Sequence, residues 1–423
     1  MSVINDGWKT LVEKYDIVEK VKKDGLFYIT ADQIREVKEP RLMTKFDTQD
    51  SLPGIFIKHH LAILPVTRGK YAIGEFSLYQ PIPDTKPDIK QITSAKIPDY
   101  YETININDIR SEANAINVMS IAGILDDFFE EENMIQTVSG RMSSENFTFN
   151  VYTSKGVYHT IDVANSQVEV DGGFENPNVF TIIEGKNVVH SDFLVRQLYY
   201  PTRLWRSKIV KPIRPIFMVY SNNIFRLMEY EFTDITLYNS IKLVKERSYS
   251  LEDIQISLDD IVSVYKATKV KPEPDVTFIQ ADSFNKVISL VERLNDNPLS
   301  TLEIADLFGF KERQSDYYYN AAKYLGLAEK RRNDEGIKVY ITTLGKKLLK
   351  LTYKKRQLEY VRLIFGHQIF YEMFDIVIRT GEVPDKAYIG KRILELGLCD
   401  KSFERRASSV RGWLFWILNL ISE

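Results

Sequence analysis

Apolar positions recur at helical spacing near the start of the chain and then change to strand-like runs. The first helical face consists of Trp8, Leu11, Val12, Tyr15 and Val18. Leu26 to Ile29 predicts a strand, and Thr30 with Gln33 is the signature of a capping box at the next helix. Apolar and aromatic residues from Ile55 to Tyr79, on both sides of the turn-like Arg68-Gly69, predict further strands. These patterns favour a small α+β N-terminal domain.

In the middle of the chain, a helical pattern from Ala113 to Phe129 precedes a series of strands. The expected strands are Phe147 to Tyr152, Val157 to Val163, Gln167 to Asp171 and Val179 to Gly185. Gly172-Gly173 predicts a turn after Asp171. A helix from Asp192 to Trp205 follows, and then a hairpin that turns at Ser221-Asn222-Asn223 between Ile213 to Tyr220 and Ile224 to Phe232.

The last part of the chain is mainly helical. Helices are expected at Phe284 to Leu294, at Thr301 to Phe308 with Ser300 as the cap, and at Gln314 to Leu325. With a strand at Lys338 to Thr342, they have the order of a winged helix. A second unit is expected from helices at Lys386 to Leu396 and Ser402 to Leu420, with a break at Gly397.

Prolines mark the two places where the periodic pattern stops. They are Pro81, Pro83, Pro87 and Pro98, and later Pro272 and Pro274. We therefore expect a mixed α+β protein with three domains, at residues 1–104, 105–272 and 273–423. The middle domain is expected to hold a central mixed β-sheet flanked by helices.

The amino-acid composition limits the class of protein and the kind of metal site that can be expected. The 423 residues are 44% hydrophobic, with no long uncharged apolar run and no basic-then-apolar N-terminus, so we expect a cytoplasmic protein that does not use a membrane. The single cysteine, Cys399, excludes an internal disulfide framework, and five scattered histidines form no zinc pattern with it. Any metal would be held mainly by carboxylate oxygen.

The formal net charge of -2 offers nucleic acid no overall attraction, so binding would need local basic surfaces. Two acid-free basic runs are present. The first contains Arg196, Arg203, Arg206, Lys208, Lys211 and Arg214, and the second contains Lys346, Lys347, Lys350, Lys354, Lys355 and Arg356. Such runs are also typical of solvated helix faces.

The most informative charges lie at the ends of two expected strands. Residues two apart share one face of a strand, so Glu169 pairs with Asp171 and Glu184 pairs with Lys186. A charge within an apolar strand is costly to bury unless it meets an opposite charge, a metal or water. If the two strands are neighbours, all four charges converge.

This set of residues suits phosphodiester hydrolysis. Carboxylates can hold Mg²⁺ against a phosphate, where the metal activates water and neutralises developing charge. We expect Asp171 and Glu184 to bind the metal and Lys186 to orient the attacking water and stabilise the phosphate. Glu169 is a candidate for a second metal, Glu112 for the same site and Gln197 for a supporting hydrogen bond. A structural salt bridge is the alternative interpretation of Glu184 and Lys186.

The arrangement resembles the PD-(D/E)xK nuclease superfamily, and within it the type II restriction endonucleases. The resemblance is carried by Glu169-Val170-Asp171-Gly172, Ile183-Glu184-Gly185-Lys186, Asp192 to Pro201 and Pro215 to Ser221, with Glu39 to Asp47 and Arg405 to Trp413 outside the core. Val170 stands where that family often has proline, which weakens the match but removes no chemistry. The resemblance implies Mg²⁺-dependent cleavage of double-stranded DNA to 5′-phosphates, a homodimer and a companion DNA methyltransferase.

Base reading is expected from the helical C-terminal part, through helices that enter the major groove. The candidate DNA-contacting residues are Arg203, Arg206, Arg313, Gln314, Tyr317, Asn320, Lys323, Arg405, Arg406, Ser409 and Arg411. The N-terminal domain is expected to help hold DNA through Arg41, Lys45 or Arg68. Two other functions stay open: a nuclease of DNA repair or transposition, and a non-catalytic winged-helix DNA-binding regulator.

Overall fold

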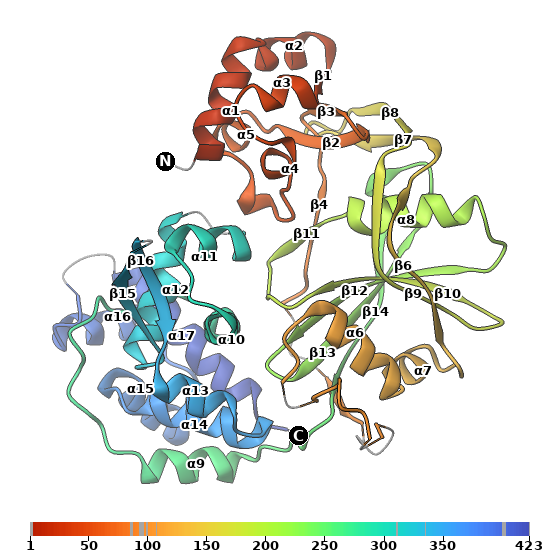
Figure 1. Ribbon diagram of the computed structural model, residues 1–423. Helices are drawn as coiled ribbons and strands as arrows, with labels where there is room; N and C mark the ends of the chain where they lie inside the picture. The colour runs from red at the N-terminus through yellow and green to blue at the C-terminus, as the bar shows by residue number, and fades with distance from the viewer. Residues whose placement is uncertain are drawn as a thin grey trace.

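A computed structural model gives the fold of the chain (Figure 1). It describes residues 3–84, 88–92, 97–98, 100–106, 108–309, 312–334, 336–399 and 403–422. An N-terminal region lies at the top of the view, a central sheet on the right and a bundle of C-terminal helices on the left. In the described ranges, no helix is both long and apolar enough to cross a membrane. The mixed α+β class expected from the sequence is confirmed.

The N-terminal region packs short helices on a small antiparallel sheet. The strands β1 (Leu26–Thr30), β3 (Lys70–Gly74) and β2 (Ala62–Thr67) pair in that order, and Trp8 and Phe56 meet in the core with ring centroids 4.7 Å apart. The helices are α1 (Val3–Lys14), α2 (Ile17–Asp24), α3 (Ala31–Arg35), α4 (Pro40–Met43), η1 (Gln49–Ser51) and α5 (Gly54–Lys58). The capping box at Thr30 and Gln33 is confirmed.

One N-terminal prediction is wrong. The start of the segment assigned to strands, Ile55 to Lys58, lies in helix α5 (Gly54–Lys58), which follows Pro53 and buries Phe56 in the N-terminal core.

The central region is built on a mixed sheet. Within the described residues this sheet has seven strands, and β10 and β12 lie parallel at its centre. In spatial order the strands are β5 (Ile89–Gln91), β14 (Ile241–Ser250), β13 (Ile224–Phe232), β12 (Ile213–Ser221), β10 (Phe180–Lys186), β9 (Gln167–Glu175) and β6 (Ile135–Ser143). The hairpin of β12 and β13 is as expected, with Asn222 and Asn223 both at positive φ.

Helices cover both faces of this sheet. Helix α8 (Arg196–Arg206) packs Leu198 and Tyr199 against Phe180 and Ile182 on one face. On the other face, α6 (Glu112–Ile121) and α7 (Ile124–Phe129) share a core with Ile183 and Ile216. The single helix expected up to Phe129 is therefore wrong, because Gly123 at φ 72 separates α6 from α7.

Two short strand pairs complete the central region. The two strands expected first in this region are present as β7 (Asn146–Tyr152) and β8 (Tyr158–Ala164), which pair with each other in antiparallel fashion. By contrast, β4 (Tyr79–Pro81) and β11 (Asp192–Leu194) pair across a long stretch of sequence. Pairing with β4 explains why the helix expected from Asp192 begins only at Arg196. Both β4 and β5 precede residue 104, so chain expected in the N-terminal domain contributes strands here; Pro87 lies outside the described residues.

The C-terminal region follows the expected order of helices and hairpin. Ser300 caps α11 through a capping box with Glu303, and the hairpin β15–β16 comes after α12. Ser402 lies outside the described residues. The elements are α9 (Leu258–Ala267), α10 (Phe284–Asp296), α11 (Thr301–Phe308), α12 (Glu312–Tyr324), β15 (Ala328–Asn333), β16 (Gly336–Ile341), α13 (Thr343–Leu349), α14 (Tyr353–Phe365), α15 (Gln368–Thr380), α16 (Lys386–Glu395) and α17 (Phe403–Asn419).

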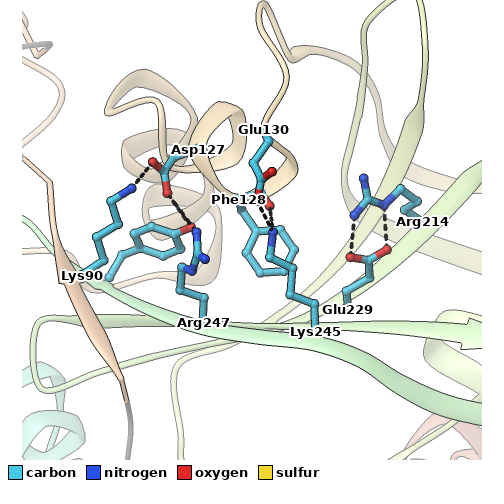
Figure 2. A network of polar contacts seen from close by, with 9 residues as sticks. Lys90, Asp127, Phe128, Glu130, Arg214, Glu229, Lys245 and Arg247 are labelled. Atoms are coloured by element: carbon cyan, nitrogen blue, oxygen red, sulfur yellow. Dashed lines mark hydrogen bonds and ion pairs between the residues drawn. The ribbon is translucent and has the colours of Figure 1, made fainter.

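A group of charged side chains fastens α7 to the edge of the sheet (Figure 2). Asp127 on α7 accepts hydrogen bonds from Lys90 and from the Tyr249 hydroxyl, and Arg247 lies 3.5 Å from it. Lys245 donates to the carbonyl of Phe128 at 2.5 Å. We call Lys90, Asp127, Lys245, Arg247 and Tyr249 the α7 cluster. Beside it, Arg214 and Glu229 form a two-point ion pair at 2.6 and 2.7 Å.

Candidate active site

Strand β10 holds the two charged residues that the sequence singled out. Glu184 and Lys186 lie on the same face of the strand, and Lys186 Nζ donates to Glu184 Oε1 at 2.6 Å. Only 8% of Glu184 is exposed, and it directly follows the buried residues Ile182 and Ile183. The pair is therefore a buried one, of the kind whose desolvation can outweigh its attraction.

Asp171 reaches the same place from the neighbouring strand. β9 and β10 are antiparallel with Gly172 opposite Ile183, and the next residues along this register are Asp171 and Glu184. The backbone N–H of Gly185 donates to Asp171 Oδ2 at 2.9 Å. The convergence expected for Asp171, Glu184 and Lys186 is thus present, and we call these three residues the site cluster.

The glycines after Asp171 do not form the turn that was expected. β9 continues to Glu175, and a Cβ at Gly172 would lie 2.8 Å from the Phe174 ring. A Cβ at Gly173 would lie 2.8 Å from Val138. The glycines therefore serve close packing within the strand, which lets β9 run directly beside β10 at the site cluster.

Two further expected residues lie beside the site cluster. Gln197, in the first turn of α8, donates from Nε2 to Glu184 Oε1, and its own Oε1 is buried without a hydrogen-bond partner among the described residues. Glu112, the first residue of α6, follows the helix cap Ser111 and lies close to Gly185, where a Cβ would be 3.6 Å from Glu112 Cβ. Both faces of the sheet thus bring an oxygen-bearing side chain to the end of β10.

Burial and charge shift the titration of these groups in a consistent way. Burial, with the charges of Asp171 and Asp47, raises the pKa of Glu184 to about 8 against the opposing charge of Lys186. Burial likewise raises the pKa of Asp171 and of Glu112. Burial disfavours the charge of Lys186, but the carboxylates of Glu184, Asp47 and Glu112 outweigh it and raise its pKa. The site therefore holds more acid than one ammonium can neutralise.

Glu169 is not part of this group. It lies on an exposed part of β9, where its Oε1 is 3.1 Å from Arg141 Nε on β6. The alternation expected to place it on the same side as Asp171 is interrupted, because β9 is irregular between Val170 and Gly173 where it pairs with β6. Its ion pair with Arg141 lies at the surface, so Glu169 lies outside the buried group around Glu184.

Asp47 is a residue that the sequence reasoning missed as a candidate for the site. Its charge acts on Asp171, Glu184, Lys186 and His190. Hydrogen bonds fix its segment there: Leu194 N–H donates to Asp47 O at 3.0 Å, and Tyr79 OH donates to Phe46 O at 3.0 Å. The only signal in the sequence was the family-like segment Glu39 to Asp47, which carried no prediction of place.

The C-terminal region also touches the end of the site strand. Burial lowers the pKa of His190 to about 4, and its Nδ1 donates to Phe308 O at 3.3 Å. Lys286 on α10 donates to Ser191 Oγ at 2.8 Å. A Cβ at Gly309 would lie 1.9 Å from Thr48 Oγ1 of the N-terminal region. All three regions therefore meet around the candidate site.

The basic residues of α8 and of the N-terminal region differ in their exposure to solvent. Arg203 is turned inward, where it donates to Ile235 O at 2.7 Å and lies over the Phe147 ring, whereas Arg206 is exposed. Arg41 and Arg68 are exposed too, and exposed Lys45 lies 3.9 Å from Asp47. Of these residues, Lys45 is the one whose charge also acts on a site group, because it lowers the pKa of Glu112 against the effect of burial.

Several candidate DNA-contacting residues of the C-terminal region, predicted on two separate units, line one pocket. They are Arg313, Gln314 and Tyr317 of α12 with Arg405 and Ser409 of α17. Asn320 and Lys323 lie further along α12, and Lys323 is exposed. Arg406 and Arg411 are half-buried on α17, with Arg411 over the Phe415 ring.

Comparison with known protein families divides the chain in three. Residues 5–73 match a domain of unknown function (DUF6996), residues 74–250 match a second one (DUF6997), and residues 286–422 match a third (DUF7226). No curated protein and no solved structure matches the chain. The site cluster lies wholly within the second of these domains, whereas Asp47 comes from the first.

Proposed function

We propose that the protein is a site-specific, Mg²⁺-dependent endonuclease of double-stranded DNA, of the type II restriction kind within the PD-(D/E)xK superfamily. The observation that supports this best is the meeting of Asp171, Glu184 and Lys186 at one place on adjacent strands. Two carboxylates and one ammonium, together at the buried end of a central strand, are a costly arrangement for structure alone.

The oxygen-bearing side chains fit a hard divalent cation. Asp171 and Glu184 offer carboxylates, and Gln197 adds a buried amide oxygen without a partner among the described residues. The described part of the chain contains no ready-made group of three or more acidic, histidine or cysteine side chains for a metal. Mg²⁺ is commonly held by one or two carboxylates, with waters and substrate phosphates as the other ligands. When bound, Mg²⁺ supplies a Lewis acid for the scissile phosphate.

The residues of the chain itself would perform the remaining tasks. Lys186 stays protonated, since its pKa is raised, and can donate hydrogen bonds to a phosphate oxygen or to the attacking water. Gln197 fixes the Glu184 carboxylate through its Nε2 donor. Gly185 N–H holds Asp171 in position. A phosphodiester placed at the end of β10 would therefore meet preorganised donors and acceptors on one side.

The restriction role is the narrower part of the proposal. It includes 5′-phosphate products, a homodimer that cuts both strands and a companion methyltransferase, all taken from the family resemblance. A nuclease of repair or transposition would use the same site cluster, but its cleavage would not give discrete fragments from DNA of defined sequence.

The test is cleavage of unmethylated plasmid and phage DNA by the purified protein with Mg²⁺ or with EDTA. Asp171→Ala and Lys186→Ala should abolish cleavage, because each removes a member of the site cluster. Lys211→Ala is the matched control, since Lys211 pairs with Glu175 at 2.8 Å at the other end of β9. Discrete Mg²⁺-dependent fragments from wild type and control would support the proposal. If all of these proteins bind DNA and none of them cleaves it, the result would favour a non-catalytic regulator.

A further inference from the structure

A pocket of about 580 Å³, lined by charged, amide and aromatic side chains, lies where the C-terminal helices meet the N-terminal region. Its walls come from α12 and α17, from the segment that precedes α10 and from η1 of the N-terminal region. The lining side chains include Asp50, Asp282, Arg313, Gln314, Tyr317 and Arg405. Elements far apart in the sequence thus build one concave surface.

The pocket offers the groups that recognise a single nucleotide. Tyr317 presents an aromatic ring, over which Arg313 lies at 5.6 Å. Gln314 carries an amide, and Asp50 carries a carboxylate that can accept from an exocyclic amino group. Arg405 is exposed at the rim and can pair with a phosphate. Aromatic stacking, edge hydrogen bonds and a guanidinium together are the usual means of holding an unstacked base.

The lining side chains set the electrostatics of the pocket. Arg313 and Arg405 oppose Asp50 and Asp282 among the lining side chains, so the pocket is mixed in charge rather than a pure anion site. A base with one phosphate suits this mixture better than a polyanion.

The pocket is also connected to the candidate active site. Lys286, which donates to Ser191 just after the site strand, is influenced by the charges of Asp282 and Asp50 in the pocket wall. A protein usually reads the sequence of an intact duplex with a protruding helix, because that helix must enter the groove to reach the base edges. A concave pocket of this size instead suits one nucleotide that has left the stack.

We propose that this pocket binds a single nucleotide, with Tyr317 as the stacking surface, Gln314 and Asp50 as readers of the base edge and Arg405 as the phosphate partner. The nucleotide can come from DNA, extruded beside the cleavage site, or from solution as a free nucleotide. The DNA source rests on the proposed nuclease function, whereas the free source does not.

The first arm of the test uses DNA. Lys186→Ala protein, which binds without cutting, is titrated with duplexes of the mapped target that carry 2-aminopurine at each adenine in turn. Extrusion should raise the fluorescence severalfold at one position. Adding Tyr317→Ala should weaken binding roughly tenfold and remove the increase, because stacking is lost. Adding Tyr388→Ala, an exposed aromatic of α16, is the matched control.

The second arm uses the four deoxynucleoside monophosphates and calorimetry with wild type, Arg405→Ala and Arg379→Ala. Arg379 is an exposed arginine of α15 paired with Asp375, and it controls for loss of charge. Nucleotide binding that Arg405→Ala weakens and Arg379→Ala does not would support the free source, even if the protein cuts no DNA. No fluorescence increase together with no nucleotide binding would overturn the proposal, and DNA cleavage in that case would leave the nuclease function intact.

Discussion

The central sheet carries two groups of charged side chains that differ in balance. In the α7 cluster, one carboxylate, Asp127, faces Lys90, Arg247 and the hydroxyl of Tyr249. These hydrogen bonds and charges overcome the effect of burial and lower the pKa of Asp127 (Figure 2). In the site cluster, two carboxylates share one ammonium, and burial raises the pKa of both.

The direction of these pKa shifts distinguishes the α7 cluster from the site cluster. A cluster that lowers the pKa of its acid stabilises the ionised form and with it the fold. In the site cluster, burial is the largest cause of the raised pKa values, and the charge of Lys186 offsets it only in part. Under the proposed function, a bound divalent cation would favour the ionised carboxylates. The same sheet thus contains one charge cluster in which hydrogen bonds and opposite charges outweigh burial and one in which they do not.

Of the variants considered, Glu184→Gln in the site cluster should change the rate of DNA cleavage most. The amide can still accept from Lys186 and Gln197, but it removes a metal-binding carboxylate, so we expect cleavage to slow by roughly 10³-fold. Unfolding by urea near pH 7.5 should show no loss of stability, because a buried acid with a raised pKa is replaced by a neutral group. A cleavage rate close to wild type would contradict the assignment of Glu184.

Arg214→Ala should do the opposite of Glu184→Gln: it should lower the stability of the fold and leave cleavage largely intact. Glu229 is only 4% exposed and would lose its two-point partner, which leaves a buried carboxylate uncompensated. We expect the free energy of unfolding to fall by about 3 kcal/mol. Cleavage measured at a temperature where the variant stays folded should be within a few fold of wild type. Glu246→Gln, on the neighbouring Arg226–Glu246 pair, is a milder control because both side chains are partly exposed.

The contrast between Glu184 and Glu169 illustrates how far sequence reasoning reaches. The two-residue alternation of strands correctly placed Glu184 with Lys186, because the pleat of β10 fixes this face. It does not hold for Glu169 and Asp171, because β9 is irregular between Val170 and Gly173 where it pairs with β6. Strand β6, which was not predicted, also brings Arg141 to Glu169 and leaves that carboxylate at the surface. A local pattern therefore shows the face of a charge only where the strand is regular.

The place of Asp47 beside the site cluster could not be predicted from local sequence pattern either. Its position depends on the pairing of β4 with β11, and no local pattern in either segment encodes a partner so distant in the sequence. The prolines from Pro81 to Pro98 instead indicated a break in the periodic pattern there. The helix predicted from Asp192 had the correct end but the wrong start, because that tertiary pairing overrides helix propensity.

The two clusters should also respond to pH with opposite signs. The folded-state pKa of Glu184 is raised to about 8, so its contribution to stability is present at low pH and is lost as the pH rises toward 8. The pKa of Asp127 is lowered, so its contribution is present at neutral pH and is lost as the pH falls through acid values.

Thermal unfolding of wild type, Glu184→Gln and Asp127→Asn from about pH 2 to about pH 9 without metal would measure this difference. The gap in stability between wild type and Asp127→Asn should shrink only as the pH falls below 3.8, the ordinary pKa of an aspartate, because the pKa of Asp127 in the folded protein is lower still. Relative to Glu184→Gln, wild type should lose stability as the pH rises toward 8. Parallel curves for all three proteins would show that the two clusters do not differ in the way described.

The smallest effect, and the sharpest test of the N-terminal region, is expected from Asp47→Asn. Burial is the main cause of the raised pKa of Glu184, and the negative charge of Asp47 adds to it. Removing that charge should lower the pKa of Glu184, so the acid limb of the pH profile for cleavage should move down by less than about one unit. Asp32→Asn, which removes an exposed carboxylate of the N-terminal region that pairs with Arg35, is the control for loss of an N-terminal negative charge. If Asp47→Asn leaves the limb in place but slows cleavage at every pH, Asp47 acts on the substrate rather than on Glu184, and the N-terminal region contributes to catalysis directly.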